Sequence, residues 1–334
     1  MKRFCIHIII FLIIWFALSI PVDIYITHKI RTSQTRAIAV WEDIFNGRID
    51  ADMLFLGSSR TSDAYNPAIF DSILGVNSYN LGMHGNLIDK DILRYNLYYK
   101  YSNRIPKYII WDLCNGAFGY SQRVFDYQFA PYLFDDDVFR LLHNSRHKFT
   151  IFDRYVPLLR YYRQKNIIGY AIKNKHFNTG YYKGFKGKDW HWNPENLNKL
   201  EDKSIPMGYN PELLPDFLNT VKKMKESGSE VIFIYSPFHY EGQVKQAGMD
   251  SLFAIYQQIA EDNNCIFLNY NYDSMCYDTS YFIDATHLNL HGANVFSAKC
   301  SKDLDSIFNF CKSKKMHLTT TNKETLQSEN EQYN

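Results

Sequence analysis

An aspartate and a histidine near the end of the chain, Asp284 and His287, have the types and spacing of a general base and the carboxylate that orients it. A histidine that acts as a base keeps one ring nitrogen free toward a nucleophile, while an acceptor holds the other nitrogen and stabilises the imidazolium. The same pairing also arises by chance or at a helix cap. A nucleophile elsewhere in the chain would therefore favour the catalytic interpretation of this pair.

A pair of serines after a predicted strand supplies that nucleophile. The apolar run over residues 51–56 ends in Gly57-Ser58-Ser59-Arg60, which is typical of a buried strand followed by a tight turn. In an open α/β sheet, functional groups gather just beyond the carboxyl ends of the strands. The alternatives are that a serine here caps a helix and that Arg60 forms a surface ion pair rather than a substrate contact.

Two further predicted strands end in residues that suit an oxyanion site. The strand at 76–81 is followed by Gly82-Met83-His84-Gly85, whose glycines let backbone amides approach a ligand closely. The strand at 108–113 precedes Asn115, whose side-chain amide could donate to a developing oxyanion or could simply occupy a turn. His84 is a candidate substrate contact, with an incidental turn or packing residue as the alternative.

Three more residues are candidates for binding substrate. His239 follows a predicted strand at 230–235, and Trp190 and Trp192 flank a histidine in an aromatic-rich segment. Indole faces are good platforms for sugar rings because they combine apolar area with a polar edge. Core packing is the alternative for both tryptophans, and an incidental turn position is the alternative for His239.

The elements that position these residues alternate regularly between strand and helix. Strands near residues 51, 76, 108, 230 and 265, separated by helices, predict a three-layer α/β/α domain with a mostly parallel five-stranded sheet over 51–312. Helices are expected over 213–227, 246–261 and 292–308. The aromatic-rich segment from about 120 to 207 interrupts this alternation of strands and helices and is interpreted as an insertion. The polar residues 313–334 are expected to form a disordered tail.

The N-terminus has the pattern of a membrane anchor. Lys2 and Arg3 precede an apolar run that ends at Ile20, which predicts a signal anchor or transmembrane helix over 1–24, with cleavage as the alternative. The positive-inside rule then places the following domain on the periplasmic or extracytoplasmic side of the cell membrane. An amphipathic pattern over 25–50 predicts a helix that leads from the membrane to the domain.

Composition excludes several classes of function. The 334 residues are 46% apolar with a formal net charge of +2, which is ample for a globular core and gives no reason to expect nucleic-acid binding. The six cysteines include no C-x-x-C pair, although a disulfide among the last five remains open in an exported domain. We expect no metal and no cofactor.

Taken in chain order, the turn residues resemble the conserved blocks of the SGNH/GDSL hydrolase superfamily over residues 51 to about 310. The resemblance implies Ser59 as nucleophile, His287 as base and Asp284 as its orienter. It also implies the Gly85 amide and Asn115 as oxyanion donors. The sequence departs from the family's pattern at two positions.

Ser58 replaces the aspartate that usually precedes the nucleophile, which leaves Ser58 as a rival to Ser59. Asn115 lacks the glycine and aspartate that usually flank it.

The Gly-Ser-Ser start, the membrane-proximal N-terminus and the insertion are similar to the exported branch of this superfamily, which acylates cell-envelope polysaccharides. That branch includes proteins of alginate O-acetylation and teichoic acid D-alanylation, which work beside a membrane-bound O-acyltransferase. The resemblance implies acyl transfer through Ser59 to an exported polysaccharide. An acetylesterase acting on glycans or small esters, and an inactive glycan-binding or assembly component, are the alternatives.

Overall fold

The computed structural model describes residues 2–33, 35–85, 87–102, 104–119, 128–144, 149–162, 181–195, 203–204 and 210–308. Its centre is a five-stranded sheet with the order β2-β1-β3-β5-β7, in which every neighbouring pair is parallel. The strands are β1 (Met53–Gly57), β2 (Ser78–Asn80), β3 (Tyr108–Asp112), β5 (Glu230–Tyr235) and β7 (Ile266–Asn269). The predicted α/β class and all five predicted strands are confirmed.

The strands read as continuous apolar runs because both faces of the sheet are covered. Along β1, Leu54 and Leu56 point into one hydrophobic cluster, whereas Met53 and Phe55 point into the other. The chain order reverses at β1, whose neighbours are β2 on one side and β3 on the other. The carboxyl ends of β1 and β3 therefore form the switch point at which open parallel sheets bind ligands.

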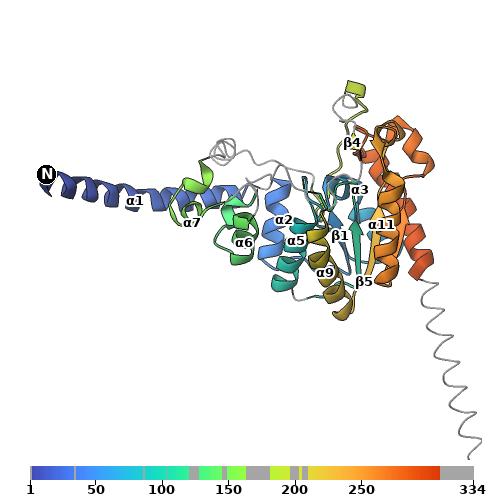
Figure 1. Ribbon diagram of the computed structural model, residues 1–334, viewed down its shortest axis with the longest axis horizontal. Coiled ribbons are helices and arrows are strands. Elements are labelled where there is room, and N and C mark those ends of the chain that lie inside the picture. Colours follow the sequence, from blue (N-terminus) through green and yellow to red (C-terminus); the bar gives the residue numbers. More distant parts are fainter. Residues whose placement is uncertain are drawn as a thin grey trace, which may run out of the picture.

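Helices cover both faces, as Figure 1 shows. The first cluster packs residues of α5, α9 and α11 on the sheet, and the second packs α4 and the helical residues 290–308. The bounds are α3 (Ser59–Ala64), α4 (Pro67–Leu74), α5 (Ile88–Tyr101), α9 (Leu214–Glu226), α10 (Tyr240–Gln243) and α11 (Met249–Asp262). Short 3-10 turns lie at Pro211–Leu213, Ser274–Tyr277 and Thr279–Tyr281.

One predicted helix begins later than its apolar pattern indicates. The pattern predicts a start at residue 246, but Gln246–Ala247 form β6, which pairs with β4 (Lys203–Ser204) in a small parallel sheet. Gly248 then adopts a left-handed conformation with φ of 79° and precedes the first turn of α11. A strand pairing made by a segment about 40 residues away overrides the local pattern.

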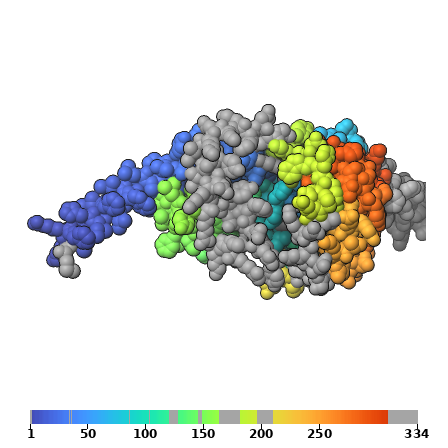
Figure 2. Space-filling model, turned by 90° about the horizontal axis from the view of Figure 1, so that it is seen from above, coloured from blue at the N-terminus to red at the C-terminus, as the bar shows by residue number. Residues whose placement is uncertain are grey.

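The N-terminal helix α1 (Lys2–Arg31) stands out from the body of the molecule (Figures 1 and 2). Its most apolar 18-residue window has a mean hydropathy of 2.6 and is 6% buried, so the helix is long and apolar enough to cross a membrane. A signal sequence would have the same properties. The helix contains Pro21 and continues to Arg31. The sequence predicts that it ends earlier, at residue 24.

The predicted helix over 25–50 is therefore divided in two. Its first part belongs to α1, whose Ile26 and Ile30 are buried against the domain, and its second part is α2 (Arg36–Phe45). Burial of these side chains explains why α1 continues past Pro21, since tertiary packing can outweigh the loss of one helical hydrogen bond.

The described parts of the insertion lie in two places. Residues 128–144 and 149–162 pack against the N-terminal helices and contain α6 (Asp136–Asn144), α7 (Ile151–Tyr155) and 3-10 turns at Ala130–Tyr132 and Leu159–Tyr161. Residues 181–195 return to the carboxyl edge of the sheet, where the amide of Asn193 donates to Ile283 O. The predicted tail over 313–334 lies outside the described residues. The described cysteines are all free thiols, and Cys311 also lies outside the described part.

A substitution at Gly57, at the end of β1, tests how closely this end of the strand packs against its neighbours. Its φ of +140° suits only glycine, and a Cβ there would lie 2.2 Å from Thr61 Oγ1 and 2.8 Å from the carbonyl oxygen of Asp112. We expect Gly57→Ala to lower the free energy of unfolding by about 3 kcal/mol, measured by chemical denaturation of the full chain in detergent.

Gly116→Ala is the matched control, because nothing lies within 4 Å of a Cβ at that position. It should change the free energy of unfolding by less than about 0.5 kcal/mol. Equal effects of the two substitutions would contradict the packing described at Gly57.

Candidate active site

A serine, a histidine and an aspartate form a continuous hydrogen-bonded chain at the carboxyl edge of the sheet. Ser59 Oγ lies 2.8 Å from His287 Nε2, although the two residues are 228 positions apart in the sequence. His287 Nδ1 lies 2.9 Å from Asp284 Oδ1 and 3.0 Å from Oδ2. With Nδ1–H donating to the carboxylate, Nε2 is free to accept the serine proton, which is the arrangement of an activated nucleophile.

The end of β1 determines which serine meets the histidine. Ser58 is the N-cap of α3: its hydroxyl accepts a hydrogen bond from the Arg60 amide, and the residue is buried. Ser59 is the first residue of α3 and presents its hydroxyl to His287. Ser58 therefore has the capping role and Ser59 the position of a nucleophile.

The Asp284–His287 segment is a tight loop organised around the carboxylate. Asp284 Oδ1 accepts hydrogen bonds from the amides of Thr286 and His287, at 2.8 and 2.9 Å, and from the Thr286 hydroxyl. The amide of Ile283 donates to His287 O, which closes the loop. Burial alone would raise the pKa of Asp284, but the hydrogen bonds and the attraction of the imidazole outweigh it and lower the pKa to about 2.

The glycine turn that was expected to supply an oxyanion amide lies along the end of β1. The amides of Leu81 and Met83 donate to the carbonyls of Phe55 and Gly57, at 2.8 and 2.9 Å. This places the turn that contains Gly85 beside the end of the strand that precedes Ser59. The role of the Gly85 amide as an oxyanion donor stays a prediction.

Asn115 has a partner that sequence reasoning did not identify. Its side-chain amide donates to Gln246 Oε1, from the short strand β6. One N–H of the Asn115 amide is therefore used within the protein, and the other is left for an oxyanion. The oxyanion role of Asn115 stays a prediction, and no local pattern marked Gln246 as its partner.

A second carboxylate–histidine pair lies beside the first. Asp63, which is buried, accepts from His84 Nε2 at 3.2 Å and from Lys188 Nζ at 2.6 Å. The His84 ring lies nearly parallel to that of His287, with centroids 6.4 Å apart. Burial opposes the charge on Asp63, but His84 and Lys188 outweigh it and hold its pKa well below the usual range.

This cluster connects the serine helix to the insertion. Asp63 follows Ser59 by four residues on α3, a spacing that places both on one helix face and that could have identified Asp63 from sequence. Lys188 Nζ lies 5.6 Å from the ring centroid of Trp190, whose side chain is 62% exposed. The exposed indole that was predicted as a sugar platform therefore lies next to the charged groups of the site.

Arg60 is not a surface residue, and the structure corrects both sequence interpretations of it. Its side chain is buried beneath the site, and its Nη2 donates to the carbonyl oxygens of Ser236 and Pro237. Its guanidinium carbon lies 4.2 Å from the centroid of the Tyr235 ring. Arg60 therefore links the ends of β1 and β5 and is not placed to bind substrate.

His239 and Trp192 also pack within the protein. His239 is buried and caps α10, since its Nδ1 accepts from the Glu241 amide. Its ring packs on Trp192, with centroids 4.3 Å apart, and burial lowers its pKa. Trp192 is partly buried against both hydrophobic clusters. His239 supports the loop that carries His287, because its amide donates to Ala285 O.

In the described part of the chain, no group of three or more histidine, cysteine, aspartate or glutamate side chains could hold a metal ion. The chemistry that this site can perform is that of a serine nucleophile activated by a histidine base.

No protein-family model matches the chain, and no curated protein matches it. Among solved structures, it is similar to a protein of Streptococcus pneumonia described as a platelet activating factor, with 12% identity, a TM-score of 0.40 and coverage of 89% of this chain and 98% of the other. It is also similar to a Bacteroides fragilis protein described as an acylhydrolase, with 13% identity, a TM-score of 0.37 and coverage of 82% and 97%. Both descriptions are provisional, and the interpretation of the site rests on its own geometry.

The lowered pKa of Asp284 predicts a stability difference that depends on pH. Because its pKa falls from 3.8 to about 2 on folding, the carboxylate stabilises the folded chain fully above about pH 4 and loses this contribution as the pH falls toward 2. We expect Asp284→Asn to be less stable than the wild type at pH 6 and to approach it at pH 2.5, measured by urea unfolding of the full chain in detergent.

Asp262→Asn, at the exposed end of α11, is the control and should follow the wild type at both pH values. A stability difference for Asp284→Asn that is the same at pH 6 and pH 2.5 would show that the carboxylate is not held as described.

Proposed function

We propose that the chain catalyses serine-dependent acyl transfer through an acyl-enzyme on Ser59. The observation that carries the proposal is the chain of hydrogen bonds from Ser59 Oγ to His287 Nε2 and from His287 Nδ1 to Asp284, located at the switch point of the sheet. The four sequence blocks that resemble the SGNH/GDSL superfamily support the same chemistry.

The reaction follows from these contacts in two halves. His287 Nε2 takes the hydroxyl proton as Ser59 Oγ attacks the acyl carbonyl, and the tetrahedral oxyanion is stabilised by backbone amides at the site. His287 then returns the proton to the leaving group, and the acyl group stays on Ser59. In the second half, an acceptor hydroxyl loses its proton to His287, attacks the ester and releases Ser59 with its proton restored.

The acceptor that we propose is a hydroxyl of an exported or envelope polysaccharide, with acetyl as the transferred acyl group. Two features favour it. The apolar α1 is suited to hold the domain at the outer face of the cell membrane, and the exposed Trp190 beside Lys188 offers a stacking surface for a sugar ring. A membrane-bound O-acyltransferase that delivers the acyl group is the proposed partner.

Hydrolysis is the second candidate. The side chains of His287 and Asp284 are 25% and 26% exposed, so water can reach the base that would activate it. Release of acetate from a chromogenic ester without any sugar, at a rate that added glycan does not change, would identify the protein as an esterase and contradict the transfer proposal.

The nucleophile is tested by labelling with a fluorophosphonate. We expect the wild type to be labelled and Ser59→Ala and His287→Ala to lose labelling, because the phosphonate reacts with an activated serine. Ser58→Ala is the matched control and should retain labelling, since Ser58 caps α3 and does not contact His287. Labelling that survives in Ser59→Ala would contradict the assignment, and an unlabelled wild type would favour the inactive glycan-binding alternative.

The sugar platform is tested separately. Trp190→Ala should lower the rate of acyl transfer to a polysaccharide acceptor about fivefold, the effect of about 1 kcal/mol of lost stacking, while fluorophosphonate labelling stays unchanged. Tyr99→Ala is the control, since Tyr99 is a half-exposed aromatic near the end of α5, which ends at the opposite edge of the sheet. An unchanged transfer rate in Trp190→Ala would show that the indole does not bind the acceptor.

A further inference from the structure

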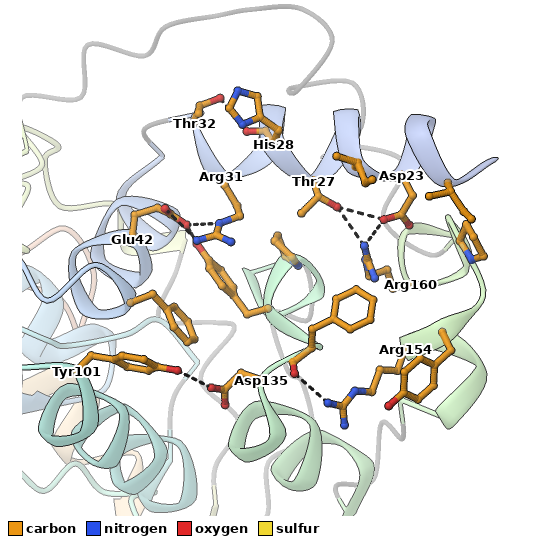
Figure 3. A pocket seen from close by; sticks show the side chains of 18 of the residues that line it. Asp23, Thr27, His28, Arg31, Thr32, Glu42, Tyr101, Asp135, Arg154 and Arg160 are labelled. Atoms are coloured by element: carbon orange, nitrogen blue, oxygen red, sulfur yellow. Dashed lines mark hydrogen bonds and ion pairs between the residues drawn. The ribbon is translucent and has the colours of Figure 1, made fainter. Parts of the chain in front are cut away.

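A cavity of about 990 Å³ lies where α1 meets the domain. One wall is formed by α1 from Phe16 to Arg31 and by Thr32, and the other by α2, the end of α5 and residues of the insertion between 131 and 160 (Figure 3). Its volume is at the upper end of the range of about 300–1,000 Å³ that is usual for sites of drug-sized ligands. The serine, histidine and aspartate of the proposed active site do not line it.

One end of the cavity wall is apolar and continues the exposed apolar face of α1. Phe16, Ile20 and Ile24 of α1 line it, as do Phe134 and Tyr155 of the insertion, whose rings lie next to Arg160 and Arg154. All five apolar and aromatic side chains are more than 40% exposed in the isolated chain. In a chain whose α1 crosses a bilayer, this end of the cavity adjoins the hydrocarbon region.

The polar wall contains three arginines: Arg31 from α1, and Arg154 and Arg160 from the insertion (Figure 3). Each of them is already paired: Arg31 with Glu42, Arg154 with Asp136 and Arg160 with Asp23. The hydrogen bonds of Arg31 use Nε and Nη2, and those of Arg154 and Arg160 use Nη2. None of these contacts uses Nη1, so each guanidinium retains N–H donors for an incoming acceptor.

The carboxylates of the same wall have no such spare capacity. Both oxygens of Asp23, Glu42 and Asp135 already accept hydrogen bonds, from backbone amides, hydroxyl groups or the neighbouring cations. The wall thus has spare donors and satisfied acceptors. The three carboxylates balance the formal charge of the three arginines. A phosphate would therefore be held by the spare N–H donors of the arginines, for which its oxygens are matched acceptors, and not by a net positive charge of the wall.

We propose that this cavity binds one anionic phospholipid from the bilayer, with its phosphate at the arginines and an acyl chain along Phe16, Ile20 and Ile24. The proposal rests on the membrane-spanning role of α1 put forward above. The apolar wall favours a lipid over free phosphate, because a small anion would leave that wall facing water. A bound lipid would contact α1 and the insertion together and so hold the domain at a set distance from the bilayer.

The test measures retention of dioleoyl-phosphatidylglycerol by the full-length protein in detergent, using native mass spectrometry over a lipid titration. The wild type should retain one lipid per chain. Ile20→Trp, which fills the apolar end, and Arg154→Gln, which removes a cation from the polar end, should each weaken retention about tenfold, the equivalent of about 1.4 kcal/mol.

Two variants serve as matched controls. Val22→Trp adds the same ring to α1 at an exposed position that does not line the cavity, and Arg140→Gln removes an exposed arginine of α6 outside it. Both should retain the lipid as the wild type does. Labelling of Ser59 by fluorophosphonate reports that each variant is folded, and Ser59→Ala should retain the lipid fully, which separates this proposal from the proposed catalysis.

Two results would overturn the proposal. Equal retention by all variants would show a non-specific lipid annulus around α1. Displacement of the lipid by glycerol 3-phosphate at matched concentration would show a site for a free phosphate compound, in which the acyl chain contributes nothing.

Discussion

The buried guanidinium of Arg60 holds the floor of the proposed active site together. It follows the nucleophile directly in sequence, yet it donates to the carbonyl oxygens of Ser236 and Pro237 at the end of β5 and stacks on the Tyr235 ring. Burial would lower the pKa of Arg60, but the attraction of Tyr235 and Asp112 outweighs it and keeps the group charged. The Nη2 hydrogen bonds join the residue after the nucleophile to the end of β5, and Asp112 at the end of the intervening β3 attracts the same buried charge.

The loop that carries His287 is also held by hydrogen bonds to distant segments. The amide of His239 donates to Ala285 O, and the amide of Leu290 donates to Lys188 O, in the returning segment of the insertion. Lys188 also pairs with Asp63 on the serine helix. The insertion therefore does more than cover the domain: its described return segment contacts both the nucleophile's helix and the base's loop, and it contributes the exposed indole.

The N-terminal helix is part of the folded domain over its last turns. Ile26 and Ile30 are buried, and Asp23 forms a buried ion pair with Arg160 of the insertion. Because these contacts join α1 to the domain, the direction of α1 fixes the orientation of the domain relative to the membrane that the helix would cross. With acyl transfer at a membrane surface as the proposed function, a rigid connection would present the carboxyl edge of the sheet at a constant position, which a flexible linker would not.

Local pattern alone determined the five strands and the α/β class, because strands buried on both faces must be continuously apolar and are therefore easy to recognise. It also determined that Ser59 lies in the turn just after a strand, since turn chemistry is local. Only the tertiary structure decided which side chains face the site. Arg60, His239 and Trp192 have polar or aromatic types that suit a substrate, but burial and partners from distant segments made them structural. Lys188 joined the site only through its contact with Asp63, which spans 125 residues, and no local pattern encodes a contact of that kind.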